Sequence, residues 1–598
     1  MKEQFLMGNH AIALGAIRAG VNLVSGYPGT PSSEILETVA KHNPGDVYVE
    51  WSVNEKSAME VAAGAAYAGA RAMVTMKQVG LNVASDPLMS LSYIGIKGGM
   101  VIVAADDPGP ISSQTEQDTR HFAQFAKLPV FDPSSPEEAY EMIGEAFAYS
   151  EKYGRPVLFR PTTRVCHACA SIAVDDTREN HTADGFVKDS RWVIFPRLTY
   201  QNHLTLEKQL AEMGRDLSSY DKNAFSGTGK KGIACGGVSV SYVREALGER
   251  ADEVKVLKIA TPNPFPEDLA LRFLDGLDEV LVVEELDPVI ERELMFLCGK
   301  HGIRVSVHGK LDGYMPKAGE YSVDIVKVTM ADFLGWPVQM PVEPELPPLP
   351  VRPPVLCAGC PHRASFYAVK QAMKGKKAVF SGDIGCYTLG NAAPLDMVDT
   401  CLCMGAGITV AQGLQRIEPD AVHFAFIGDS TFFHTGIPGV LNAAYNGTKI
   451  VLIVLDNATT AMTGHQPHPG TGRTMMGDIS AAISIPDVLH ACGVEQVETV
   501  NPLDLEAAKA AVDRAVQAER IAAVIFKSPC IAVTRPAQAY TVDAARCTGC
   551  MRCIRELGCP AIVLDGGKAR IDAGLCYGCT VCAQVCPFGA IGKEEGVQ

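Results

Sequence analysis

The sequence contains no long apolar run and no excess of positive charge, and each absence argues against a class of protein. No stretch of about 18 uncharged apolar residues occurs, so we expect no membrane-spanning helix. The formal net charge of -15 at pH 7 would repel a phosphate backbone over most of the surface, and we expect no nucleic-acid partner. The N-terminal segment carries little positive charge and continues into a helical pattern, so we expect no signal peptide and a cytoplasmic protein.

Cysteine, by contrast, is abundant: 19 of the 598 residues are cysteine. Eight of them form two runs, spaced C-x2-C-x2-C-x5-C-P and C-x2-C-x2-C-x3-C-P. Such runs are typical of paired [4Fe-4S] clusters, in which the fourth cysteine of each run ligates the other cluster. The predicted ligands of the first cluster are Cys547, Cys550, Cys553 and Cys586. Those of the second cluster are Cys576, Cys579, Cys582 and Cys559.

Two other interpretations of these cysteines are weaker. A zinc ribbon uses four ligands as two C-x2-C pairs and gives no role to a third cysteine at the same short spacing. A disulfide framework is disfavoured because we expect no secretory signal and therefore a reducing compartment. The five-residue gap before Cys559 is longer than the usual three residues. It affects the expected loop geometry more than the expected role of Cys559 as a ligand.

Alternating helical patterns and short apolar runs predict an α/β protein of several domains. We expect a doubly wound domain over residues 1–190, a smaller α/β domain over 230–335 and a second doubly wound domain over 355–535. Proline density in the segment 336–354 predicts a semi-rigid linker, and residues 540–598 should form a ferredoxin-like α+β module. The expected strands are 72–76, 99–105, 156–161, 254–260, 279–286, 421–428, 449–456 and 522–527.

Polar residues follow two of these strands at the points where they end. Asp429 comes directly after the strand 421–428, and Asn457 follows the strand 449–456. Because open α/β sheets bind ligands at the carboxyl ends of their strands, we expect the two residues to face one crevice. Their hard oxygen ligands, with Thr459 nearby, suit a Mg2+ ion that also holds a diphosphate.

The residues around Asp429 strengthen this interpretation. Gly428 would let the backbone approach a phosphate closely, and a helix beginning near Gly436 would direct amide N–H groups at it. A Gly-Asp turn alone is uninformative, but with the Asn457 that follows it is similar to the thiamine diphosphate motif that runs from Gly-Asp-Gly to Asn. Ser430 replaces the last glycine of that motif.

At this point the sequence resembles a known family. The segments GDSTFFHTGIPGVLNAAYN and DNATTAMTGHQPHPGTG are similar to the thiamine-binding half of the 2-oxoacid:ferredoxin oxidoreductases. The order of the motifs along nearly the whole chain most resembles the α subunits of the indolepyruvate:ferredoxin oxidoreductases. The resemblance implies two doubly wound thiamine-diphosphate-binding domains, with the 230–335 domain similar to the C-terminal domain of transketolase.

The resemblance also implies a third cluster. Family members hold a cluster near the thiamine through cysteines in a C-x-G-C loop, a G-x-G-C turn and an S-P-C segment. The matching residues here are Cys357, Cys360, Cys386 and Cys530. The alternative is a set of unrelated buried cysteines, since cysteine is among the most buried residue types. Cys401 and Cys403 have no family counterpart.

Several catalytic residues follow from the same resemblance. The loop GYPGTPSSE is similar to the family loop in which a threonine contacts the substrate carboxylate, a role that would fall to Thr30, while Gly29 replaces the usual isoleucine and would widen the pocket. Glu55 matches the glutamate that, bonded to N1′ of the aminopyrimidine, activates the cofactor. His434 and His465 lie on segments expected to border the thiamine and could act as acid or base.

The predicted function is therefore oxidative decarboxylation of an aryl 2-oxo acid, such as indolepyruvate or phenylpyruvate, to the arylacetyl-CoA with reduction of ferredoxin. The predicted partners are ferredoxin, CoA and a smaller β subunit in an α2β2 assembly. The alternatives are specificity for an arylglyoxylate or an aliphatic 2-oxo acid, a non-redox thiamine-dependent decarboxylase, and a non-catalytic electron-transfer or scaffold subunit.

Overall fold

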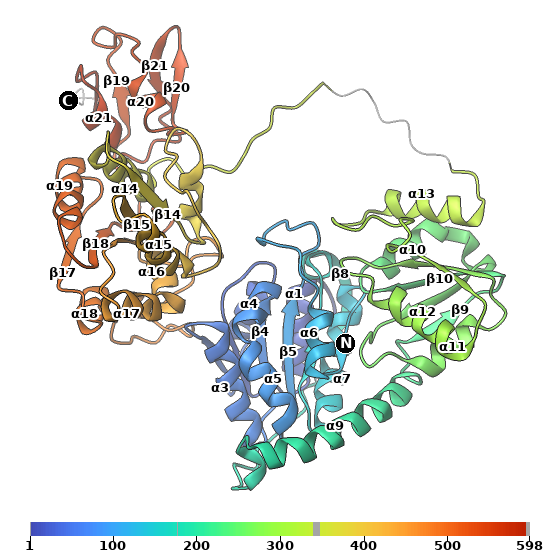
Figure 1. Ribbon diagram of the computed structural model, residues 1–598. Coiled ribbons are helices and arrows are strands. Elements are labelled where there is room, and N and C mark those ends of the chain that lie inside the picture. Colours follow the sequence, from blue (N-terminus) through green and yellow to red (C-terminus); the bar gives the residue numbers. More distant parts are fainter. Residues whose placement is uncertain (1, 176, 339–346, 594–598) are drawn as a thin grey trace. The chain divides into compact units, whose positions relative to one another are not determined.

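The structure is a computed structural model that describes residues 2–175, 177–338 and 347–593. The chain divides into two compact units, Met1–Glu345 and Leu346–Gln598. Each unit is described by itself (Figure 1). All eight apolar runs that were expected to be strands form strands.

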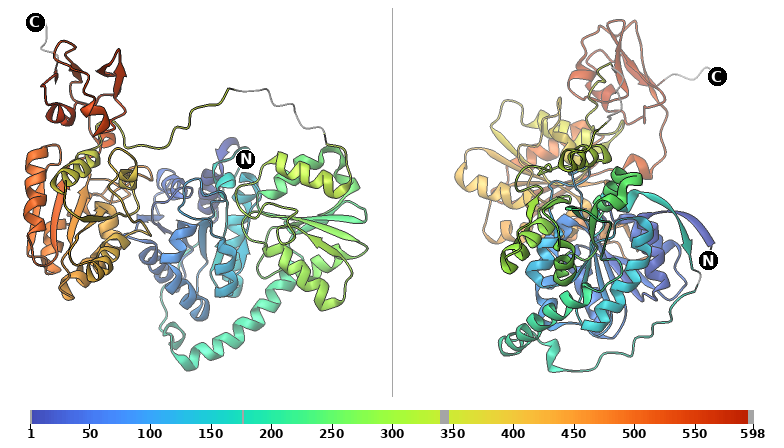
Figure 2. Two further views of the ribbon diagram at one scale, coloured as in Figure 1. Left: turned by 45° about the horizontal axis from the view of Figure 1, so that its top comes forward. Right: turned by 90° about the vertical axis from the view of Figure 1, so that its right-hand side faces the viewer.

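The first unit begins with a six-stranded, fully parallel sheet in the order β3-β2-β4-β5-β7-β6. Its strands are β2 (Leu23–Gly26), β3 (Tyr48–Trp51), β4 (Ala72–Lys77), β5 (Met100–Ala105), β6 (Val130–Phe131) and β7 (Val157–Phe159). Its helices are α1 (Gly8–Arg18), α2 (Ser33–Lys41), α3 (Glu55–Tyr67), α4 (Gln78–Val83), α5 (Ser85–Ile94), α6 (Thr119–Ala126), α7 (Pro136–Tyr153) and α8 (Thr163–His167). Helices lie on both faces of this sheet (Figures 1 and 2), which explains why every residue of β5 is buried.

A smaller α/β domain follows in the same unit. Strands β1 (Lys2–Met7) and β8 (Cys169–Val174) pair before helix α9 (Pro196–Leu217) leads into it. Its sheet has the order β13-β12-β10-β11-β9, with β9 as an antiparallel edge strand. The strands are β9 (Ala224–Ser226), β10 (Lys231–Gly236), β11 (Lys255–Ile259), β12 (Glu279–Val283) and β13 (Ser306–His308). The helices are α10 (Ser239–Leu247), α11 (Glu267–Leu274), α12 (Val289–His301) and α13 (Val323–Leu334).

Buried ion pairs join the two domains of this unit. Arg120, which is 1% exposed, pairs with Asp118 at 2.5 Å and with Glu284 at 2.7 Å. Arg160 pairs with Asp106 at 2.6 Å. Burial raises the pKa of Asp106 to about 6, although the Arg160 charge opposes the shift. Asp106 directly follows β5 and pairs within the first domain, whereas the Arg120–Glu284 pair joins the two domains.

The second unit contains the other parallel sheet, in the order β14-β15-β16-β18-β17. Its strands are β14 (Ala378–Ser381), β15 (Val422–Gly428), β16 (Val451–Asp456), β17 (Gln496–Val500) and β18 (Ala522–Lys527). Its helices are α14 (Pro361–Ala372), α15 (Ala406–Ile417), α16 (Asp429–Thr431), α17 (Ile437–Tyr445), α18 (Ile485–Ala491) and α19 (Leu505–Val516). Residues 339–346 of the predicted linker lie outside the described residues, and residues 347–354 are exposed without helix or strand.

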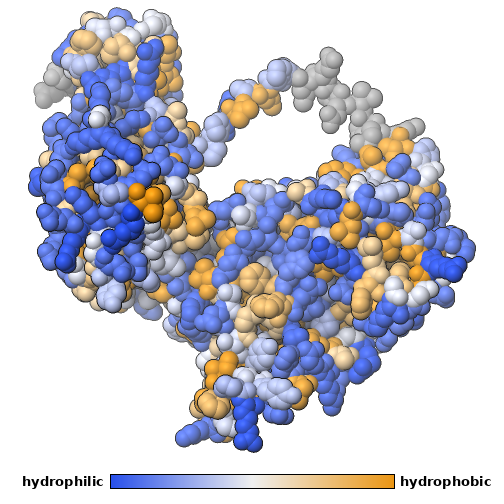
Figure 3. All heavy atoms as spheres, viewed as in Figure 1, coloured by the Kyte–Doolittle hydropathy of each residue, from blue (hydrophilic) through white to orange (hydrophobic). Residues whose placement is uncertain are grey.

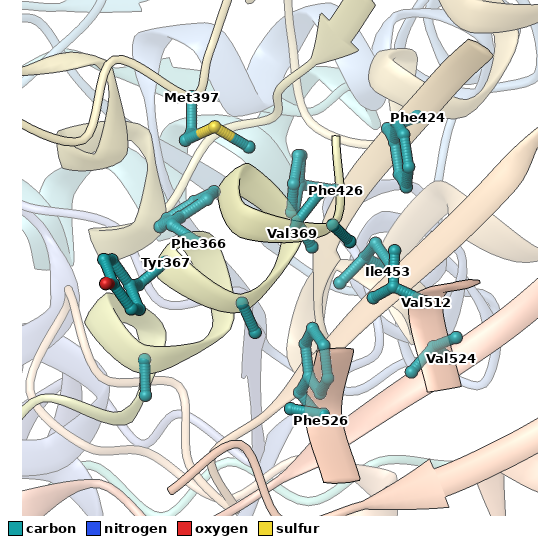
Figure 4. Close-up of a cluster of buried hydrophobic side chains, with 14 of the residues drawn as sticks. Phe366, Tyr367, Val369, Met397, Phe424, Phe426, Ile453, Val512, Val524 and Phe526 are labelled. Carbon is teal, nitrogen blue, oxygen red and sulfur yellow. The ribbon is translucent and has the colours of Figure 1, made fainter. Parts of the chain in front are cut away.

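Alternation along the strands explains the two cores of this sheet. Phe424 and Phe426 of β15 point to the face that is covered by α14 and α19 (Figure 4). Ala425 and Ile427, the residues that alternate with them, point to the face that is covered by α15, α17 and α18. Helices on both faces make this domain doubly wound, as predicted.

The chain ends in a small α+β module that packs on the second sheet domain. Its elements are β19 (Tyr540–Val542), α20 (Arg552–Arg555), β20 (Ile562–Asp565), β21 (Lys568–Ile571), α21 (Val581–Val585) and β22 (Ile591–Lys593). Strands β19 and β22 form one antiparallel pair and β20 and β21 form another. The module lies beside α14 (Figure 2), where Tyr367 donates a 2.6 Å hydrogen bond to Glu556.

The surface is mostly hydrophilic, and hydrophobic atoms gather near the start of α9 on the face shown in Figure 3. The exposed apolar side chains of that segment are Phe186, Val187, Val193, Ile194 and Phe195. Among the described residues, no helix has both the length and the apolar character needed to cross a membrane.

Replacing Arg120 should destabilise the first unit strongly. Arg120→Met leaves the buried Glu284 without its paired cation and leaves the buried Asp118 with Arg160 at 3.9 Å alone, a change that costs about 3–5 kcal/mol. The midpoint of thermal unfolding, followed by circular dichroism on the full chain, should fall clearly. The control is Arg178→Met, because Arg178 pairs at 2.7 Å with the largely exposed Asp46, and such pairs contribute at most about 1 kcal/mol. Equal losses in both variants would contradict this account.

Candidate functional site

The loop after β2 carries the predicted substrate-contacting threonine. Buried Asn9 donates hydrogen bonds to the carbonyl of Pro31 (2.6 Å) and to Glu34 (2.9 Å). The amide of Gly29 donates to the Ser33 hydroxyl at 2.9 Å. These bonds fix the loop on both sides of Thr30, which remains partly exposed and can therefore reach a ligand.

The predicted activating carboxylate begins helix α3. Asn54 caps this helix by accepting a hydrogen bond from the Ser57 amide at 2.8 Å. Glu55, in the first turn, is 5% exposed, a position where the helix dipole favours a carboxylate. A Cβ atom at Gly80 would lie 2.7 Å from the Glu55 Oε1 atom. Gly80, which sequence reasoning missed, therefore leaves the space that Glu55 occupies.

A buried lysine in the same unit was also missed. The Cγ and Cδ atoms of Lys77 would lie 3.1 and 3.3 Å from a Cβ atom at Gly29. Gly29 was expected to widen the pocket, but the Lys77 side chain occupies the space beside this glycine. Burial lowers the pKa of Lys77, and the charges of Glu55 and Asp107 oppose the shift. A cation thus lies near both the Thr30 loop and Glu55.

In the second unit, Asp429 links the ends of two neighbouring strands. The residue is 2% exposed. Its Oδ2 atom accepts hydrogen bonds from the amides of Asn457 (3.1 Å) and Ala458 (2.8 Å), and its Oδ1 atom accepts one from the Ser430 amide (2.8 Å). The expected approach of Asp429 and Asn457 is therefore present.

Two histidines that sequence reasoning missed complete this site. The Nε2 atom of His468 lies 3.1 Å from Asp429 Oδ2, while its Nδ1 atom accepts from the Gly470 amide, so Nε2 carries the proton and donates. His362 Nε2 lies 3.3 Å from the side-chain nitrogen Nδ2 of Asn457. Burial lowers the pKa of His362 to about 4 against the opposing charge of Asp429, so His362 is neutral and accepts.

The remaining predicted residues of this site differ in their placement. Thr459 is buried, and its amide donates to the Asn457 side-chain oxygen at 3.3 Å. His434 is buried, whereas His465 is exposed. The structure brings His468, rather than His465, to Asp429.

The structure adds two details to the predicted phosphate site. Helix α17 starts at Ile437, next to Gly436 as predicted, but helical structure already begins at Asp429 and passes through a π-helical turn, Phe432–Gly436. The strand end therefore passes directly into helix, seven residues before Gly436. The space at Gly428 is filled by Tyr387, whose ring carbon would lie 2.6 Å from a Cβ atom there, so this glycine makes room for a side chain.

The eight C-terminal cysteines line two separate cavities. The outer cavity is lined by Cys547, Cys550, Cys553 and Cys586. The inner cavity is lined by Cys559, Cys576, Cys579 and Cys582 and also by Cys360 and Arg363 of the sheet domain. Each cavity thus combines three cysteines of one run with the fourth cysteine of the other run, which is the grouping the spacing predicts. Among the described residues, no three His, Cys, Asp or Glu side chains meet closely enough for a single metal ion.

The two cysteine loops repeat one backbone conformation. Met551 and Thr580, at matching positions of the loops, have φ angles of 57° and 70° and begin α20 and α21. Amides also donate to the sulfur atoms, from Tyr540 to Cys576 at 3.5 Å and from Ala590 to Cys586 at 3.3 Å. The two loops therefore form two similar groups of cysteines, one in each half of the module.

The four cysteines expected to hold a third cluster lie on three segments around the second sheet. Burial raises the pKa of Cys386 to about 11, and the charges of Cys530 and Cys357 add to the shift, so these three thiols lie within electrostatic reach of one another. The Cys360 amide donates to the Cys357 carbonyl at 3.2 Å. Cys401 and Cys403 are exposed.

Comparisons with known proteins assign three regions of the chain. Residues 14–203 match the family described as pyruvate flavodoxin/ferredoxin oxidoreductase, thiamine diP-bdg. Residues 383–526 match the C-terminal TPP-binding domain of thiamine pyrophosphate enzymes, and residues 539–593 match the 4Fe-4S dicluster domain. These regions define a thiamine-diphosphate-dependent oxidoreductase of the 2-oxoacid:ferredoxin class.

Curated relatives narrow the class. The indolepyruvate oxidoreductase subunit IorA of Methanothermobacter thermautotrophicus is 45% identical over 99% of this chain and 97% of its own length. The subunits IorA of Archaeoglobus fulgidus and Pyrococcus horikoshii are 43% and 41% identical, each over 99% of this chain and 97% of their own length. The chain belongs to this IorA family of the 2-oxoacid:ferredoxin oxidoreductases. A solved 2-oxoglutarate:ferredoxin oxidoreductase from Magnetococcus marinus aligns at 19% identity with a TM-score of 0.45, over 55% of this chain and 65% of that one.

The close contact between Gly80 and Glu55 predicts that both residues are needed for turnover. Gly80→Ala should displace the carboxylate and lower the rate about 100-fold, and Glu55→Gln should lower it by at least as much because the proton acceptor is lost. The rate is measured anaerobically by viologen reduction with a 2-oxo acid and CoA, together with the iron content.

The matched control is Gly64→Ala in α3, because a Cβ atom at Gly64 meets nothing within 4 Å. This variant should keep full activity, since alanine is favoured over glycine inside a helix. Full activity in Gly80→Ala would show that the position of Glu55 is unimportant.

Proposed function

We propose that this chain is the catalytic subunit for oxidative decarboxylation of an aryl 2-oxo acid. The balanced reaction converts the 2-oxo acid, CoA and two oxidised ferredoxins to the acyl-CoA, CO2, two reduced ferredoxins and one proton. The observation that carries the proposal is the presence, in one compact unit, of a strand-end oxygen site and two cavities, each lined by four cysteines of the C-terminal module. The strand-end site suits a diphosphate and its cation, and the two cavities suit one-electron carriers.

The residues at the strand ends suit thiamine diphosphate with Mg2+. Asp429, Asn457 and Thr459 would hold the cation through hard oxygen atoms. His468 and His362 keep two of these side chains in place, since they contact Asp429 and Asn457 respectively. When bound, thiamine diphosphate supplies the electron sink that decarboxylation of a 2-oxo acid requires.

The residues of the first unit would orient the cofactor and the substrate. Glu55, held over Gly80, would accept the hydrogen bond of the aminopyrimidine N1′ and so help to move a proton there. Thr30 and Lys77 would bind the substrate carboxylate, the hydroxyl as a hydrogen-bond donor and the ammonium as a countercharge. His434 remains a candidate acid or base because of its burial, whereas the exposure of His465 makes it the weaker one.

The thiols would hold two [4Fe-4S] clusters and a third near the strand-end site. The inner and outer cavities each offer four cysteines of the C-terminal module. The third set, Cys357, Cys360, Cys386 and Cys530, is supported by the electrostatic proximity of its members. Because such ligation needs reduced thiols, a cytoplasmic location forms part of the proposal.

The substrate and partner assignments rest on the relatives. The name of the IorA relatives supports indolepyruvate or a similar aryl 2-oxo acid. Their designation as subunits supports a partner chain, for which we propose a smaller β subunit in an α2β2 assembly. The exposed apolar side chains at the start of α9 offer surface for such a contact. We propose CoA as the acyl acceptor and ferredoxin as the electron acceptor.

A panel of 2-oxo acids tests the proposed function. The purified chain, alone and with its smaller subunit, is assayed anaerobically with indolepyruvate, phenylpyruvate, an arylglyoxylate, pyruvate and 2-oxoglutarate, with CoA and viologen. We expect the aryl pyruvates to have the highest kcat/KM, by at least about tenfold. A preference for an arylglyoxylate or an aliphatic acid would change the substrate, and aldehyde formation without viologen reduction would indicate a non-redox decarboxylase.

The same assay examines Lys77. Lys77→Met should raise the KM of every acid in the panel, because all of them carry the carboxylate that the ammonium is proposed to bind. An unchanged KM would remove Lys77 from the substrate site.

The iron content of the loaded chain tests the proposed third cluster. Since each cluster holds four irons, the loaded chain should contain about twelve irons, and Cys357→Ser should reduce this number to about eight. Cys401→Ser is the control and should leave the number unchanged, because Cys401 is exposed and outside the proposed ligand set. If the loaded chain contains about eight irons and Cys357→Ser does not change this number, the chain holds two clusters and the proposed third cluster is rejected.

A further inference from the structure

The inner cavity contains a buried cation that the outer cavity lacks. Arg363, on helix α14, is 6% exposed and lines the inner cavity together with Cys559, Cys576, Cys579 and Cys582. The lining of the outer cavity, apart from its cysteines, consists of Val542, Thr548, Met551, Ala569, Pro587, Phe588, Ala590 and Ile591. The two cavities therefore differ in charge although their cysteine loops repeat one conformation.

Backbone carbonyls hold the guanidinium group in place. The NH1 group of Arg363 donates to the carbonyls of Leu557 (2.6 Å) and Gly558 (2.9 Å), which directly precede Cys559. Its NH2 group donates to the carbonyls of Leu356 (2.6 Å) and Cys357 (3.3 Å). Arg363 thus bridges a loop of the C-terminal module and the loop that contains Cys357 and Cys360.

These carbonyls leave the positive charge without a counterion. Among the described residues, no carboxylate pairs with Arg363, and its Nε atom is buried without a hydrogen-bond partner. An isolated buried charge is costly unless an opposite charge compensates it. Burial raises the pKa of Cys579, and the Arg363 charge opposes this shift, so the guanidinium already acts on a thiol of the inner cavity.

We propose that Arg363 is the counter-cation of the inner iron–sulfur cluster and raises its reduction potential. A cluster with four thiolates carries net negative charge, and reduction adds one electron to it. A buried positive charge beside it stabilises the reduced form more than the oxidised form. Arg363 therefore makes the inner cluster a better acceptor of the single electron, which comes from the substrate during turnover or from dithionite in a titration. The inference rests on the proposed cluster assignment.

Two substitutions separate charge from hydrogen bonding. Arg363→Gln removes the charge and keeps one donor group, whereas Arg363→Lys keeps the charge and loses most of the bonds. Each is made in the full-length chain, loaded with iron and titrated anaerobically with dithionite and mediators while the reduced clusters are followed by electron paramagnetic resonance. The signal of the inner cluster is identified by its alteration in Cys582→Ser.

In Arg363→Gln we expect the equilibrium constant for reduction of the inner cluster to fall at least tenfold, which corresponds to about 59 mV for one electron. In Arg363→Lys this equilibrium constant should stay within about threefold of its value in the unsubstituted chain. Arg546→Gln is the control, because Arg546 is exposed and its guanidinium group donates to the Phe588 carbonyl near the outer cavity, and it should shift neither cluster.

An unshifted inner cluster in iron-replete Arg363→Gln overturns the role of Arg363, and so does an equal shift in Arg363→Lys. If Arg363→Gln fails to retain iron, the result for Arg363→Lys decides. An equilibrium constant for reduction of the inner cluster within threefold of the unsubstituted chain supports the proposal, and a tenfold lower constant overturns it. Absence of [4Fe-4S] signals in the unsubstituted, iron-loaded chain would instead reject the cluster assignment itself.

Discussion

One turn, Cys357–Arg363, which includes the first residues of helix α14, ties the C-terminal unit together. Its last residue, Arg363, donates to the carbonyls of Leu557 and Gly558 in the module with the two thiol-lined cavities. The residue before it, His362, contacts Asn457 at the strand-end site. Cys360 lines the inner cavity. Because a single turn makes all three contacts, the strand-end site and the inner cavity cannot shift independently.

Packing gives this turn its rigidity. Helix α14 begins within it at Pro361 and buries Phe366 and Val369 against the sheet. A Cβ atom at Gly359, whose φ angle is 79°, would lie 2.4 Å from the Cβ atom of Tyr577, the neighbour of Cys576. Only glycine fits both the left-handed backbone and this approach. Electron transfer between carriers depends steeply on their separation, so a rigid connection of this kind suits the proposed function.

The features that local spacing determines could be predicted from the sequence. The fold class and the strands followed from apolar runs, because parallel strands are buried on both faces. The grouping of Cys586 with the first run and of Cys559 with the second followed from the repeated motif. The approach of Asp429 to Asn457 followed from the geometry of strand ends. In each case the signal lies in a few consecutive residues or in a regular repeat.

The residues that sequence reasoning missed depend on distant parts of the chain. Lys77 was missed because its relation to Gly29 arises only when β2 and β4 pair, and Gly80 because its space is used by a side chain from α3. His468 follows His465 by three residues, and only the turn at His465, with its φ angle of 68°, decides which imidazole reaches Asp429. Arg363 gives no signal of its own, since an arginine at the start of a helix is usually exposed. The helix at Asp429 starts early because the strand end passes straight into it.

Burial connects these missed residues with the chemistry of the cysteines. Desolvation raises the pKa of Cys360 and of Cys582 to about 12 and that of Cys386 to about 11. Thiolates are the form that binds iron, so ligation must release protons that burial otherwise retains. A fixed cation and amide donors reduce this cost, and at the inner cavity the chain provides both, through Arg363 and the Tyr540 amide. The outer cavity has an amide donor from Ala590, and no basic or acidic side chain lines it in the part of the chain that the structure describes. The same asymmetry that would ease assembly at the inner cavity would therefore also separate the two proposed clusters in reduction potential.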